Sequence, residues 1–127
     1  MSAQLALMAL LLFKHWLADF PWQSQWMVRE KGKMSVALSV HCIVHMVCSF
    51  VAIVAFSWCT GVWFEARVLA GLLVAEFYVH AVIDAIKVHP RWGGRWKLPN
   101  PRFCTALGAD QLAHHLTYIA MVAYLFR

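Results

Sequence analysis

The chain has 127 residues, of which 62% are hydrophobic and only 13% are charged. A soluble domain is typically about 45–50% apolar and about 25% charged. This composition excludes a disordered, a collagen-like and an ordinary soluble protein, and the length allows a single domain. The formal net charge is +5. Its basic residues fall in short segments between long apolar stretches, so we expect no nucleic-acid partner.

Four apolar stretches are each long enough to cross a bilayer as a helix, because a helix rises about 1.5 Å per residue and the hydrocarbon core is about 30 Å thick. They cover residues 3–20, 36–58, 68–88 and 106–126. No alternating barrel pattern is present, and helices satisfy their own backbone hydrogen bonds in lipid. The sequence therefore predicts an all-α integral membrane protein, with four transmembrane helices in an up-down bundle that forms one domain over 1–127.

The basic residues are unevenly divided between the two sides of this predicted bundle. The segments 21–35 and 89–105, together with the edge of the third span, carry Arg29, Lys31, Lys33, Lys87, Arg91, Arg95, Lys97 and Arg102. The opposite side carries only Arg67 and Arg127. Cytoplasmic loops are enriched in lysine and arginine. We therefore expect both segments to be cytoplasmic loops, and both termini to lie outside the cytoplasm, in a multi-pass protein of the inner (plasma) membrane.

Ionisable side chains recur inside all four predicted spans, where they are expensive and therefore candidates for function. They form the i,i+4 pairs His15/Asp19, His41/His45, His80/Asp84 and Asp110/His114. Residues four apart share one face of a helix. The pairs lie near the C-terminal ends of the first and third spans and near the N-terminal ends of the second and fourth. In an up-down bundle they would meet at one level, close to the cytoplasmic side.

Imidazole and carboxylate groups without cysteine are the ligands of zinc, iron and manganese sites. Helix bundles build dimetal centres from such side chains, and a cation offsets the repulsion between clustered carboxylates. The sequence predicts one or two divalent transition-metal ions (Zn, Fe or Mn) held by His15, Asp19, His41, His45, His80, Asp84, Asp110 and His114. His115 is turned away from His114 by about 100°, and we expect it to be a bystander. The alternative for the whole set is a metal-free polar network that carries protons or ions.

Further polar residues extend the i,i+4 pairs into longer polar stripes along the helices. We predict catalytic roles for Asp19, Glu76 and Lys87. Asp19 and the deeper Glu76 are candidates for the general base or for a group that orients a ligand. Lys87 lies one turn beyond Asp84 and would bind an anionic group of a substrate, with extension to the membrane interface as the alternative. We expect Lys14, inside the first span, to extend to the cytoplasmic interface.

Three stretches resemble the motifs of a known family. The sequence HWLADF at 15–20, followed by Gln23, Trp26 and Lys31, resembles the opening motif of a domain-of-unknown-function family of small bacterial and phage membrane proteins. IDAIK at 83–87 resembles its third-helix motif, and DQLAH at 110–114 resembles its last. More distantly, the placement of His and Asp is similar to that of membrane-bound, metal-dependent hydrolases of the YdjM type. The resemblance implies a membrane location and these site residues.

The leading hypothesis is a membrane-embedded, metal-dependent hydrolase, because a bound metal activates water and polarises a scissile group. The site would open at the cytoplasmic headgroup level, so we expect membrane lipid as a partner and a lipid or amphiphilic (phospho)ester as the substrate. A second copy of the chain is a further candidate partner. The alternatives are a metal or proton transport or sensing element, and a non-catalytic membrane interaction protein with a structural metal. The apolar outer halves of the spans argue against a continuous path.

Overall fold

The structure is a computed structural model that describes residues 2–30 and 35–127. Its elements are α1 (Ala3–Asp19), α2 (Gln25–Glu30), α3 (Val36–Thr60), α4 (Ala66–Val88), the short 3-10 helix η1 (Gly93–Arg95) and α5 (Pro101–Leu125). The predicted all-α class is confirmed for these residues. The basic residues Lys31 and Lys33 of the predicted first loop lie outside the described residues.

Local capping signals set the ends of the long helices. Ser35 precedes α3, and its hydroxyl oxygen accepts a hydrogen bond from the Leu38 amide at 3.4 Å. Gly61 ends α3 in the left-handed region (φ 73°), which favours glycine because it has no Cβ. Asn100 caps α5 and Pro101 is its first residue, a position that suits the fixed φ of proline. α5 therefore begins before the predicted boundary at 106, which rested on hydropathy alone.

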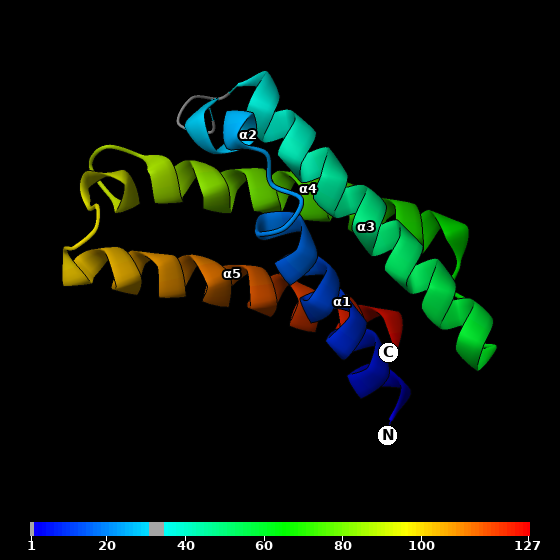
Figure 1. Ribbon diagram of the computed structural model, residues 1–127. Coiled ribbons are helices and arrows are strands. Elements are labelled where there is room, and N and C mark those ends of the chain that lie inside the picture. Colours follow the sequence, from blue (N-terminus) through cyan, green and yellow to red (C-terminus); the bar gives the residue numbers. More distant parts are fainter. Residues whose placement is uncertain (1, 31–34) are drawn as a thin grey trace.

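The four long helices form two antiparallel pairs that cross each other (Figure 1). α1 packs against α3 and α5, and α4 packs against the same two helices. α2 packs on α3, and η1 lies at the far end of the α4–α5 pair. The helix axes therefore do not share one direction, as they would in a regular up-down bundle.

Two segments of the described chain are long and apolar enough to cross a membrane: Val36–Thr60 and Ala66–Arg95. α1 is shorter, with 17 residues, and α5 is interrupted by polar residues along its N-terminal half. The two segments are consistent with membrane association. A bundle with four transmembrane spans stays a prediction.

In the described residues, polar groups make up half of the buried set and many large apolar side chains are exposed, which is unusual for a soluble protein. The buried set contains 11 hydrophobic residues and 11 polar or charged residues. Large apolar side chains are exposed instead, such as Val36, Trp58 and Tyr78 with exposed fractions of 73%, 74% and 65%. Contiguous exposed apolar surface is unfavourable in water and favourable against another apolar phase. The distribution suits surroundings of low polarity.

The interior has an apolar half and a polar half. The apolar half lies where the N-terminal end of α1 meets the C-terminal ends of α3 and α5, and includes Leu7, Leu11, Ile53, Phe56 and Met121. The histidine and aspartate residues occupy the other half, towards the C-terminal end of α1 and the N-terminal end of α3. An ion pair separates the two halves.

This ion pair joins Lys14 of α1 to Glu76 of α4, with 2.5 Å between Nζ and Oε1. The Lys14 ammonium also donates to the Tyr118 hydroxyl at 2.8 Å and to the backbone oxygen of His45 at 3.2 Å. Ser49 donates to the same Glu76 oxygen at 2.8 Å. The expectation that Lys14 extends to the membrane interface is wrong. Lys14 lies on the face of α1 that packs against the other helices, and the Glu76 carboxylate holds its amine inside.

We expect Lys14→Met to lower the free energy of unfolding by about 3–5 kcal/mol, because it leaves the Glu76 carboxylate buried without its cation. The double variant Lys14→Met/Glu76→Leu removes both charges and should be less destabilised than the sum of the two single variants predicts. Denaturant titration in detergent, followed by circular dichroism, measures these values. Lys97→Met, at an exposed position outside the helices, is the matched control. A Lys14→Met value within about 0.5 kcal/mol of the wild type would contradict the interpretation.

Candidate metal centre

Five imidazole rings from four helices converge in the polar half of the interior. The rings of His41 and His45 on α3 lie 4.5 Å apart between centroids, and His45 lies 4.0 Å from His80 on α4. His80 lies 4.1 Å from His114 on α5, which lies 5.0 Å from His15 on α1. All five histidines are buried. The i,i+4 spacing of the pairs explains the convergence, since it keeps each pair on the inward face of its helix.

The first group of donor atoms consists of Asp19, His41, His45 and His80, with ligand atoms that all lie within 4.8 Å of one another. Asp19 Oδ1 lies 3.2 Å from His41 Nε2 and 3.1 Å from His45 Nε2. His80 Nε2 lies 3.2 Å from His41 Nε2. Four ligands at about 2.0–2.1 Å from a zinc-like ion in tetrahedral geometry are about 3.3 Å apart. The spacing therefore approaches that of a ligand shell around one ion.

Hydrogen bonding alone does not satisfy this arrangement at His41. Its Nε2 atom has close neighbours in Asp19 Oδ1, His80 Nε2 and Asp84 Oδ2, the last at 3.5 Å. A neutral imidazole nitrogen offers either one proton or one lone pair, so it can satisfy only one of these neighbours. A cation between them would interact favourably with every lone pair at once. The Nδ1 atom of His41 lies 3.4 Å from the Gln23 amide nitrogen, which leaves Nε2 for the group.

The second group consists of His80, Asp84 and His114, and it shares His80 with the first. The Nδ1 atom of His114 lies 2.9 Å from the backbone oxygen of Asp110, one turn earlier on α5. Donation of the Nδ1 proton to that oxygen fixes the tautomer in which Nε2 carries a lone pair. A metal-bound histidine is commonly held in this way by its second nitrogen. The His114 Nε2 atom is buried and has no hydrogen-bond partner.

Other buried polar atoms of the described chain share this property, namely His45 Nδ1, His80 Nδ1, Asp110 Oδ1 and Glu76 Oε2. A buried polar atom without a partner loses its hydration without compensation, and native interiors contain few of them. Their concentration around the two groups indicates that the interior can hold a further cation or water. The donor set and its spacing fit a metal ion.

His15 and Asp110, which we also predicted as ligands, lie beside the two groups and not within them. His15 Nδ1 lies 3.2 Å from the Tyr118 hydroxyl, and His15 Nε2 lies 3.3 Å from Asp19 Oδ2. Asp110 Oδ2 accepts a hydrogen bond from Lys87 Nζ at 2.7 Å. Gln111 bridges the two aspartates, since its amide nitrogen lies 3.1 Å from Asp110 Oδ2 and 3.2 Å from Asp19 Oδ2. Through these contacts, His15 and Asp110 help to hold the two ligand groups in position. That either residue is itself a ligand stays a prediction.

The residues with predicted catalytic roles occupy three different places. Asp19 lies within the first group, and Glu76 lies one layer deeper in the ion pair with Lys14. Lys87 is only partly buried, with 31% of its side chain exposed, and pairs with Asp110 at the edge of the centre. His115, the expected bystander, is half-buried and belongs to neither group of the described residues.

Sequence reasoning missed two members of the surrounding network, Tyr118 and Ser49. Both extend stripes that had been recognised, since Ser49 follows His45 by four residues and Tyr118 follows His114 by four. The Tyr118 hydroxyl donates to Glu76 Oε1 at 3.2 Å and contacts His15, so it joins the ion pair to the residues beside the two donor groups. The continued i,i+4 period was the available signal.

A family model described as protein of unknown function (DUF3307) matches residues 7–127, and the chain therefore belongs to this family. The resemblance to a domain-of-unknown-function family is thus confirmed. No curated protein and no solved structure matches the chain, so its likeness to YdjM-type hydrolases stays a prediction.

We expect metal-stripped protein to bind Zn²⁺ or Mn²⁺ and to melt at a higher temperature when it does, because ligands of the folded state stabilise it. Since His80 belongs to both groups, His80→Ala should weaken binding about tenfold or more, which corresponds to about 1.4 kcal/mol. Calorimetric titration and metal analysis of detergent-purified protein measure this. His115→Ala is the matched control and should bind as the wild type does. Equal binding by the two variants would exclude the assigned donor set.

Proposed function

We propose that this member of the DUF3307 family is a membrane-embedded metal-dependent hydrolase. Its proposed substrate is a lipid or amphiphilic (phospho)ester at the cytoplasmic leaflet. The observation that carries the proposal is the convergence of two His/Asp groups, from four helices, on a shared His80; all members are buried except Asp19, which is half-buried. The proposed cofactor is one or two divalent transition-metal ions (Zn, Fe or Mn). When bound, they would supply an activated water and polarise the ester.

The two groups differ in the number of donors, and this supports a division of roles. Asp19, His41, His45 and His80 offer four donors, which is the complete set of a closed structural site. The second group offers three, His80, Asp84 and His114, or two of its own when His80 binds an ion in the first group. A three-donor site leaves a position for water or substrate, which is typical of catalytic centres. We assign the chemistry to the second group.

The surrounding residues have positioning roles in this proposal. Asp110 orients His114 through its backbone oxygen, and Gln111 ties Asp110 to Asp19. Glu76 Oε1 already accepts from Lys14, Ser49 and Tyr118. We therefore assign Glu76 to orienting the network. The general base would come from Asp19 or from a carboxylate oxygen that the ion does not use.

The proposed location is the inner membrane, with four spans and with the centre near the cytoplasmic headgroups. Two membrane-length helices and the apolar exterior support it. So does the basic character of the segment that follows α4, which carries Arg91, Arg95 and Lys97.

A structural metal in a non-catalytic membrane protein is the second candidate, and the closed four-donor group favours it. The two candidates differ in their dependence on the second group. A purely structural ion in the first group would leave His114 without a chemical role. A hydrolase would need His114 for turnover and much less for folding.

We expect His114→Ala to lower the rate of metal-dependent phospholipid hydrolysis about 100-fold or more, the scale of a positioned catalytic group. The measurement is release of the cleaved headgroup from mixed micelles, with the metal-loaded wild type as reference. His115→Ala is the neighbouring control and should retain the wild-type rate.

The helical signal and the melting temperature of His114→Ala should stay close to those of the wild type, since the first group is intact. Loss of the fold together with metal would instead favour the structural role. A metal-loaded wild type that hydrolyses no phosphoester or carbonyl ester of an amphiphile would overturn the hydrolase assignment.

A further inference from the structure

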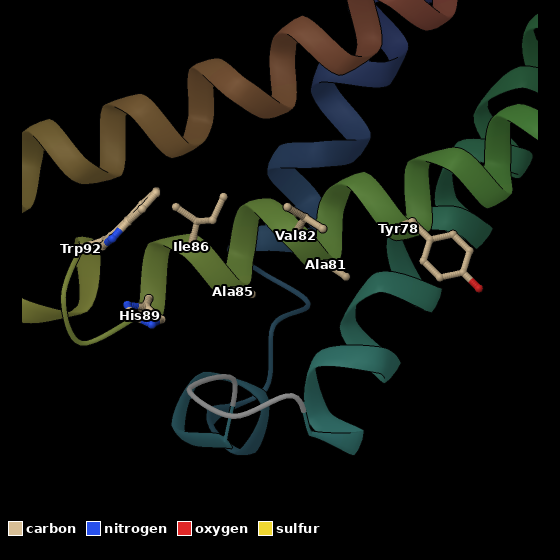
Figure 2. A pocket seen from close by; sticks show the side chains of 7 residues that line it. All are labelled: Tyr78, Ala81, Val82, Ala85, Ile86, His89 and Trp92. Carbon is tan, nitrogen blue, oxygen red and sulfur yellow. The ribbon is translucent and has the colours of Figure 1, made fainter.

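A groove of about 470 Å³ runs between α4 and α5, beside the metal centre. Its walls include Trp92, Trp96, Ile86 and Ala109, and Lys87, Arg91 and Asp110 supply its polar lining near the C-terminal end of α4. A second apolar hollow of about 370 Å³ follows the outer face of α4 from Tyr78 to Trp92, and the two share Ile86 and Trp92. Figure 2 shows Ile86 and Trp92 directed towards α5, whereas Tyr78 points away at the other end. Cavities of about 300–1,000 Å³ with apolar walls and a few polar groups are typical of small-molecule sites.

The polar end of the groove carries a surplus of positive charge. Lys87 lies in the last turn of α4, and Arg91 lies in the turn that follows this helix; both line the groove. The buried carboxylate of Asp110 pairs with Lys87. An ammonium has three donors, so Lys87 retains donors after this bond. Arg91 is exposed and adds a full cation. The end of the groove is therefore complementary to an anion.

The same end is continuous with the metal centre. The Asp110 side chain lines the groove, and its backbone oxygen lies 2.9 Å from His114 Nδ1. Asp110 Oδ2 is joined through the Gln111 amide to Asp19. A molecule with its anionic group at Lys87 would thus lie next to the residues that position the second metal group. Its apolar part would extend along the walls towards Ile83 and Ala113, one turn deeper in the bundle. Trp92 and Trp96, residues that favour the headgroup level of a membrane, would lie beside the anionic group.

We propose that this groove binds an anionic phospholipid, with the phosphate at Lys87 and Arg91 and one acyl chain along the apolar walls. The inference rests on the proposed function in treating this lipid as the substrate of the His80–Asp84–His114 group. Charge complementarity selects a lipid with a net negative headgroup over a zwitterionic one. In this proposal one acyl chain lies in the groove, and the other chain remains in the bilayer.

Photo-crosslinking in vesicles tests the proposal. The full chain is reconstituted in phosphatidylcholine with a trace of phosphatidylglycerol that carries a diazirine on one acyl chain, and labelled peptides are mapped by mass spectrometry. We expect the label to concentrate in residues 83–113. Arg91→Ala should lower labelling about fivefold, equivalent to about 1 kcal/mol for one basic residue at an anionic surface. Arg102→Ala, at the exposed start of α5 and outside the groove, should leave labelling unchanged.

A second pair of variants tests the groove itself. Ala109→Trp fills the space between α4 and α5 from an exposed position, and labelling of 83–113 should fall to background. Ala120→Trp introduces the same side chain on an exposed part of α5 outside the groove and should have no effect. Equal labelling by a zwitterionic phosphatidylcholine probe, or label spread evenly over all exposed helix faces, would overturn the inference.

Metal analysis of the same samples separates this inference from the proposed function. Metal-loaded protein without selective labelling of the groove would overturn the lipid site and leave the metal centre intact. Selective labelling of protein that binds no metal would uphold the lipid site and overturn the hydrolase. Retained metal content in Ala109→Trp also shows that the variant is folded, so its loss of label reports on the groove.

Discussion

The structure depends on the burial of imidazole and carboxylate donors at the point where two helix pairs cross. Groups of this kind are costly in an apolar interior unless they are paired or neutralised. Here Asp19 Oδ1 lies 3.2 Å from His41 Nε2 and 3.1 Å from His45 Nε2, and the exterior of the same helices is apolar. Burying so many polar groups is favourable only if they interact with one another or with a shared cation. The crossing supplies this geometry, because it brings the polar stripes of all four helices to one place.

The ion pair of Lys14 and Glu76, which lies next to the donor groups, explains how the two helix pairs are held in their crossed arrangement. The Lys14–Glu76 pair connects α1 to α4, and Ser49 and Tyr118 add α3 and α5 to the same carboxylate. Removal of one partner from such a pair costs more than the pair contributes, so the pair specifies one packing arrangement more than it adds stability. Tyr118 then contacts His15. The deep pair and the donor groups are therefore one connected network, joined by the Tyr118 hydroxyl and by the hydrogen bond from Lys14 to the backbone oxygen of His45.

Much of this architecture could be predicted from the sequence, because the inward faces follow from i,i+4 spacing. The i,i+4 spacing of His41 and His45, for example, predicts that both side chains lie on one face of their helix. The two donor groups of the structure contain six of the eight predicted ligands. The remaining features are properties of the tertiary structure. Lys14 could not be assigned to the interior without knowing that Glu76 faces it across the bundle. Hydropathy along the sequence does not indicate that the two helix pairs cross. The positions of His15 and Asp110 beside the donor groups depend on side-chain geometry, which cannot be predicted from the spacing of residues.

The separation into a four-donor and a three-donor group also divides the three stretches of the sequence that resemble family motifs. HWLADF contributes Asp19 to the closed group, whereas IDAIK and DQLAH contribute Asp84 and His114 to the open one. The motif residues Lys87 and Asp110 also form the polar end of the groove between α4 and α5. In the proposed function, the first stretch would thus belong to the part that holds the helices together. The later two would combine an open metal position with anion-binding residues, which is the combination that hydrolysis of an anionic lipid needs.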